Sequence, residues 1–137
     1  MWHDYGLALW HVGRHAEAVQ NFQNAIITNP NFPPPGLWCR TLLARKGYNN
    51  LACALVMLGI SNQQLPLVQQ GLAATEQALQ LAPQNPLYWR NAAVLLNLAG
   101  ESPQAAWERY RQANPQAAAA EELQGIPRDC TWEFYFR

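Results

Sequence analysis

The chain has 137 residues, of which 50% are hydrophobic and 13% are charged, with nine basic and nine acidic residues. This balance excludes a highly charged disordered chain and gives no support to a nucleic-acid binder that relies on global positive charge. The longest apolar run, residues 51–60, is too short to cross a bilayer, so membrane insertion is not expected.

The first predicted unit is a helical hairpin over residues 2–30. Apolar or small residues recur three, four and seven positions after Trp2, which is the spacing of one face of an amphipathic helix. Gly13 is expected to end this helix, because glycine tolerates positive φ. A second helix, over 17–28, is expected to stop before Pro30, since proline disfavours helix in the residue preceding it.

Residues 31–47 are predicted to be an insert. Its prolines at 33–35 favour polyproline II, and 37–46 is predicted to form a short helix that Gly47 closes at its C-terminal end. Basic residues near that end favour the helix dipole, with binding of an acidic partner as the alternative: Arg40, Arg45 and Lys46.

Two further hairpins are predicted, over residues 48–83 and 87–115. The spacing between Trp2 and Gly13 recurs between Tyr48 and Gly59 and between Trp89 and Gly100, so each glycine is expected to end a helix. The extra residues of the second hairpin are expected in a loop around 60–66. In the third hairpin, Ser102 is the predicted N-cap of the second helix.

The last part of the chain, residues 116–137, is predicted to be a capping helix followed by an aromatic tail. Asn114 and Pro115 supply a cap and a first turn, and Gly125 closes the helix. Alternate residues of the tail would show one aromatic face if it were extended: Trp132, Phe134 and Phe136. We expect that face to be packed, either closing the helical stack or filling its groove.

The first hairpin closely resembles the tetratricopeptide (TPR) repeat at these residues: Trp2, Tyr5, Gly6, Leu9, Gly13, Ala18, Phe22, Ala25 and Pro30. The second and third hairpins are degenerate versions. The resemblance implies a single all-α domain over residues 1–137. It would be a right-handed α-solenoid of three helical hairpins, with an inserted short helix and a C-terminal capping helix. In that family the first helices of the hairpins line a concave groove.

Groove residues follow from this expectation, as the positions on the first helices that stacking does not use. Their asparagines can pair with a peptide backbone, and Arg90 could fix one carboxylate of a ligand. The alternative for Leu7, Val94 and Leu98 is packing against the insert helix or the tail. The predicted partner-binding set is His3, Leu7, Trp10, His11, Asn49, Asn50, Cys53, Val56, Met57, Arg90, Asn91, Val94, Asn97 and Leu98.

The expected function is that of a protein-interaction adaptor, scaffold or assembly factor, which binds an apolar or amphipathic segment of another protein. The two-carboxylate clamp of chaperone-binding relatives is not expected, because only Asn50 matches it. The alternatives are a self-associating module, joined through its uncapped N-terminal end or its aromatic tail, and a regulatory segment of a larger enzyme.

No catalytic residue, cofactor or metal is expected. His11 and His15 have i, i+4 spacing, but Gly13 lies between them and no other ligand motif accompanies them. Three widely spaced cysteines without a paired motif, and no signal-peptide pattern, predict a reduced, cytoplasmic setting.

Overall fold

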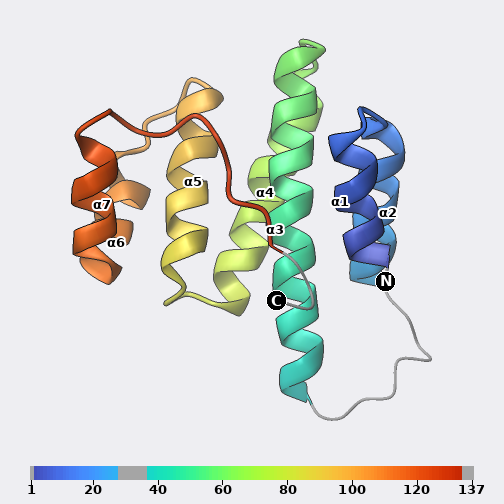
Figure 1. Ribbon diagram of the computed structural model, residues 1–137, viewed down its shortest axis with the longest axis horizontal. Helices are drawn as coiled ribbons and strands as arrows, with labels where there is room; N and C mark the ends of the chain where they lie inside the picture. Colours follow the sequence, from blue (N-terminus) through green and yellow to red (C-terminus); the bar gives the residue numbers. More distant parts are fainter. Residues whose placement is uncertain (1, 28–36, 134–137) are drawn as a thin grey trace.

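A computed structural model describes residues 2–27 and 37–133, and within these residues it contains only helices (Figure 1). The expected all-α class is therefore confirmed. None of the described helices is both long enough and apolar enough to cross a membrane. The helices are α1 Trp2–His11, α2 His15–Ile27, α3 Leu37–Ser61, α4 Leu65–Leu81, α5 Pro86–Leu98, α6 Gln104–Ala113 and α7 Pro115–Glu122.

Each helix packs chiefly against its neighbours along the chain. Figure 1 shows α1, α3, α5 and α7 side by side, with α4 and α6 behind them. Three contacts join neighbouring hairpins: α2 packs against α3, α4 packs against α5, and α3 packs against α5. A row of antiparallel helices results, and one face of that row carries α3 and α5.

In two of the three hairpins, a glycine follows the end of the first helix, as predicted. Gly13 follows α1 with φ +88°, and Gly100 follows α5 with φ +82°. The prediction for Gly59 is wrong, because α3 continues to Ser61 and the turn uses Gln63 at φ 56° instead. A Cβ on Gly59 would lie 2.8 Å from the backbone nitrogen of Val68, so this glycine serves the close approach of α4.

The predicted short helix over 37–46 is also wrong as an element of its own. α3 runs unbroken for 25 residues and contains Gly47 as a buried residue in its interior. A glycine inside a helix costs only about 1 kcal/mol relative to alanine, which tertiary packing readily offsets. The predicted polyproline segment at 33–35 lies outside the described residues.

Two further predictions concern the ends of helices. The expected loop over 60–66 is not formed, because the extra residues lengthen α3 and α4 and leave a turn of 62–64. Ser102 is not the N-cap of α6: Pro103 holds that position and no side chain caps the helix. Asn114 does cap α7, where its side chain accepts a hydrogen bond from the backbone nitrogen of Ala117 at 3.4 Å.

The main hydrophobic cluster joins α1 to α5, and a second cluster joins α5 to α7 around Trp107, Tyr110 and Ala118. Hydrogen bonds fix α7 on α6: the Trp107 indole donates to Glu122 at 2.6 Å, and the Tyr110 hydroxyl donates to Glu121. Burial and the bond to Glu121 raise the pKa of Tyr110 to about 12. The pKa of Glu122 is lowered by the bonds from Trp107 and Arg111.

The approach of α3 to α4 gives a first testable prediction. A Cβ on Gly71 would lie 2.6 Å from Cγ2 of Val56 and 2.9 Å from its backbone nitrogen. Gly71→Ala is therefore expected to lower the free energy of unfolding by about 1–3 kcal/mol through overpacking, in spite of the higher helix propensity of alanine. Urea unfolding measures this change. The control is Gln70→Ala at the exposed neighbouring position, and equal stability of the two variants would contradict the prediction.

Candidate functional site

The chain's own C-terminal segment lies across the face formed by α3 and α5. We call residues 123–133 the tail. The tail leaves the end of α7, crosses α5 and reaches α3 (Figure 1). Gly125 stands near its start with φ +86°, a conformation that favours glycine. The position of the tail makes the helices beneath it the best candidate for a binding site.

Three buried asparagines, which we call the asparagine clamp, hold the tail: Asn49 and Asn50 on α3 and Asn91 on α5. Their exposed fractions are 3%, 0% and 1%. The Asn91 side chain donates to the carbonyl oxygen of Thr131 at 2.8 Å and accepts from the Thr131 backbone nitrogen at 3.0 Å. One amide side chain thus satisfies both backbone groups of one tail residue.

Asn50 repeats this arrangement two residues further along the tail. Its side chain donates to the carbonyl oxygen of Glu133 at 2.7 Å and accepts from the Glu133 nitrogen at 2.9 Å. Asn49 lies between the two, donating to the carbonyl oxygen of Thr131 and to the Asn50 side chain, each at 3.2 Å, and accepting from Asn91 at 2.8 Å. The three amides therefore form one connected network under the tail.

The register of these bonds is that of an edge strand. In an extended chain, the backbone groups of residues i and i+2 point to the same edge, while the side chains of i−1 and i+1 share one face. The clamp takes the place of a neighbouring strand for Thr131 and Glu133. Cys130 and Trp132, which alternate with these two residues along the tail, turn their side chains toward the helices.

Trp132 and Cys130 pack on the same hydrophobic cluster but contact different residues of it. The Trp132 ring lies 5.4 Å from the ring of Trp10 and 6.0 Å from that of Phe22, measured between centroids. Cys130 is buried in the same cluster, where its thiol contacts that of Cys53. Burial raises the pKa of the Cys53 thiol well above its usual value, and the contact with Cys130 raises it further. Both thiols are buried, and so shielded from reagents in solution, while the tail is in place.

Arg90 ties the tail to the last helix. Its guanidinium pairs with Glu121 of α7 at 2.8 Å. It also donates to the carbonyl oxygen of Asp129 at 3.2 Å and to the hydroxyl of Thr131 at 3.1 Å. The carboxylate partner expected of Arg90 in a ligand is supplied here by the protein itself.

The predicted groove residues are placed as follows. Three of the four asparagines expected to pair with a peptide backbone do so with the tail, whereas Asn97 is exposed on α5. Binding of a partner protein by these residues stays a prediction. Of the other predicted positions, Leu7, Cys53 and Val94 are buried in the cluster that holds the tail, Trp10, Met57 and Leu98 are half-buried, His11 is exposed, and the side chain of His3 lies outside the described residues.

The placement of Val56 in the groove is wrong. Val56 faces α4, where its side chain would meet a Cβ on Gly71, and it is fully buried. Ala52 and Gly59 share this orientation, because positions i, i+4 and i+7 of a helix lie on one face. The face of α3 toward the tail is the one that carries the clamp asparagines and Cys53.

Sequence reasoning missed the groove contact of Phe22, which lies on a second helix, and the roles of Thr131 and Glu133. Phe22 was expected only as a signature position of the hairpin. The tail offered an alternation of residues but no signal for its register, because any extended chain presents the same backbone groups.

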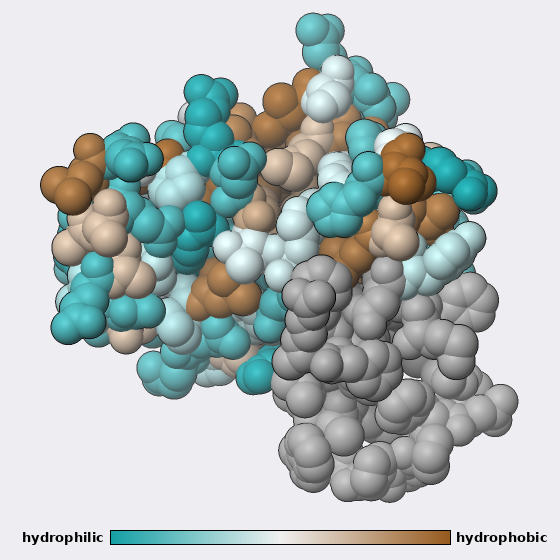
Figure 2. Space-filling model, viewed as in Figure 1, coloured by the Kyte–Doolittle hydropathy of each residue, from teal (hydrophilic) through white to brown (hydrophobic). Residues whose placement is uncertain are grey.

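No protein-family model, no curated protein and no solved structure matches this chain. The site must therefore be interpreted from its own geometry. The face seen in Figure 2 is mostly hydrophilic or intermediate in hydropathy, with hydrophobic residues in separate patches. No group of three or more potential metal ligands occurs among the described residues.

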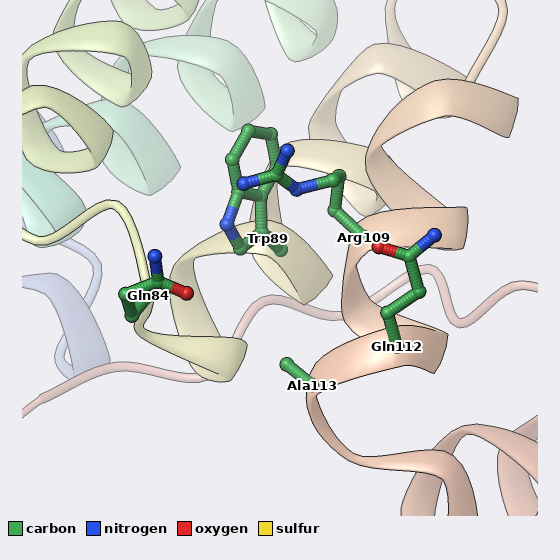
Figure 3. A pocket seen from close by; sticks show the side chains of 5 residues that line it. All are labelled: Gln84, Trp89, Arg109, Gln112 and Ala113. Atoms are coloured by element: carbon green, nitrogen blue, oxygen red, sulfur yellow. The ribbon is translucent and has the colours of Figure 1, made fainter.

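Away from the tail, a hollow with a volume of about 270 Å³ lies between the start of α5 and α6 (Figure 3). The guanidinium of Arg109 covers the Trp89 ring at 4.8 Å from its centroid, and the Trp89 indole donates to the carbonyl oxygen of Pro83 at 2.8 Å. Arg109 and the Trp89 indole thus form a cation–π contact. Apart from these two residues, only Gln84, Gln112 and Ala113 line the hollow, so it lacks a reactive group.

The clamp gives a second testable prediction. Asn91→Ala removes the acceptor of the Thr131 backbone amide and one of the two donors to the Thr131 carbonyl oxygen. The hydrogen exchange of that amide is therefore expected to accelerate by about tenfold or more. Amide exchange followed by NMR measures this rate. Asn97→Ala, at an exposed position on the same helix, is the matched control and should leave the rate unchanged. Equal rates in the two variants would show that the clamp does not hold the tail.

Proposed function

We propose that this chain is a protein-interaction module, a short stack of TPR-like helical hairpins, whose groove binds an extended peptide segment. The groove is the surface formed by the asparagine clamp and by the side chains around Cys130 and Trp132. The role is that of an adaptor or scaffold, without catalysis or a cofactor.

The observation that carries this proposal is the paired hydrogen bonding by Asn50 and Asn91. Each side chain satisfies the backbone nitrogen and the backbone carbonyl of one residue, at distances between 2.7 and 3.0 Å. Backbone groups are common to every peptide, so such contacts supply affinity for extended chains in general. Contacts of the neighbouring ligand side chains, as Cys130 and Trp132 make them in the tail, supply selectivity.

The TPR-like architecture is supported by the residues of the first hairpin and by the order of packing. Gly6 is buried where α1 meets α2, and a Cβ there would lie 2.7 Å from the ring of Phe22. This small residue opposite a large one belongs to the signature that the first hairpin resembles. A cytoplasmic setting remains part of the proposal, and the free thiols of Cys53 and Cys130 suit a reducing compartment.

The test uses the 137-residue chain with Trp132→Ala, which weakens its own tail, and a fluorescent peptide of residues 127–137. We expect saturable binding by anisotropy. Adding Asn91→Ala to the chain should weaken this binding by about tenfold or more, because a buried donor and acceptor lose their partners.

The matched control adds Asn97→Ala to the same Trp132→Ala chain and should bind the peptide as strongly as the Trp132→Ala chain alone. The proposal fails if no saturable binding occurs up to about 1 mM peptide. It fails equally if the peptide binds but Asn91→Ala has no effect, because the peptide would then occupy another surface.

A further inference from the structure

The tail is seated in the groove as a ligand would be, on helices whose core is almost complete without it. Among the buried apolar side chains of the described residues, only Cys130 comes from the tail. Trp132 is half-buried at the edge of the main cluster. Ile126, near the start of the tail, packs against the second hydrophobic cluster. Most of the hydrogen bonds that hold residues 127–133 go to backbone groups and to the Thr131 hydroxyl, which any extended segment of similar chemistry could replace.

The start of the tail has the features of a hinge. Leu123 is 88% exposed, and a Cβ on Gly125 would meet nothing within 4 Å. The hydrogen bonds from the backbone nitrogens of residues 124 and 125 stay local, to Glu121 and Glu122. A change of direction at this point would release the tail with loss of the contact between Ile126 and the second hydrophobic cluster, while Trp107 and Tyr110 still hold α7 in place.

The side chains of the tail define what the groove accepts. The first position is closed, because Cys130 is buried against Cys53 and a larger side chain there would overpack the cluster. The next position is open, since Thr131 is exposed and is held mainly through its backbone, with one hydrogen bond from Arg90 to its hydroxyl. The third is a wide apolar site between Trp10 and Phe22, which suits a planar aromatic ring.

We infer that the groove selects an extended segment of a partner protein with a small side chain followed two residues later by a large aromatic one. Such a segment binds by displacing residues 127–133 of the chain itself. This inference rests on the proposed function and names the class of ligand for the same site.

Competition within the chain follows from the short connection. A ligand tethered by a few residues has an effective concentration on the order of millimolar. The tail therefore blocks weak and unselective peptides, and a partner must match both side-chain positions to replace it. The tail acts as a built-in filter on what the module binds.

The experiment measures selectivity first. Peptides of residues 127–137 are titrated into the 137-residue Trp132→Ala chain. A Cys130→Ala peptide should bind as strongly as the natural sequence. A Thr131→Ala peptide should bind within about threefold of it, because that exposed side chain makes one hydrogen bond, from Arg90, and the residue is held mainly through its backbone. Cys130→Leu and Trp132→Ala peptides should each bind about tenfold more weakly or worse.

Displacement is measured next, in the wild-type chain. The Cys130→Ala peptide, which carries no thiol of its own at that position, is added with iodoacetamide, and alkylation at Cys130 of the protein is followed by peptide mapping. We expect the peptide to accelerate alkylation at Cys130, and the Trp132→Ala peptide to have no effect. The wild-type chain should bind the Cys130→Ala peptide at least about tenfold more weakly than the Trp132→Ala chain does.

The outcomes separate the two levels of the account. Failure of every peptide to bind the Trp132→Ala chain overturns the proposed function. Binding that is indifferent to positions 130 and 132, or that leaves Cys130 protected in the wild-type chain, overturns the inference alone. A dimer fraction that increases with protein concentration in light scattering also overturns the inference, because each groove would then hold the tail of another copy of the chain.

Discussion

Buried side-chain amides impose the strictest condition on this molecule. An asparagine has two donor hydrogens and an oxygen that accepts twice, and leaving them unsatisfied in the interior costs about 1–3 kcal/mol per group. Asn49, Asn50 and Asn91 satisfy one another only in part, and the backbone of the tail supplies further partners to each of them, as Arg90 does to Asn91. The face of α3 and α5 is therefore built to have an extended chain on it, and the packing around it keeps the amides in register.

Much of the fold could be predicted from the sequence, because helix periodicity and glycine turns are local signals. Gly13 and Gly100 end their helices where the spacing from the aromatic residue indicated. Gly59 has the same spacing but a different role, since it lets α4 approach α3. The sequence alone does not separate these two uses of glycine: one depends on φ and the other on a neighbour that is distant along the chain.

The candidate site was predictable in its chemistry but not in its detail. Amide side chains on the first helices indicate readout of a backbone, whatever the peptide. Which residues of α3 face the tail depends on where α4 packs. Val56 was wrongly predicted to lie in the groove because its side chain faces α4. The aromatic spot between Trp10 and Phe22 combines two helices and the tail, so no single periodic pattern reveals it.

The central claim is that the tail lies on the clamp as an extended segment in one register. Solution NMR of the unmodified chain tests it most directly, through nuclear Overhauser effects between the Asn91 side-chain amide and the Thr131 backbone amide, and between the rings of Trp132 and Trp10. The account predicts both sets of contacts in the monomer. A tail without either contact, with the Asn91 amide open to solvent, would contradict it.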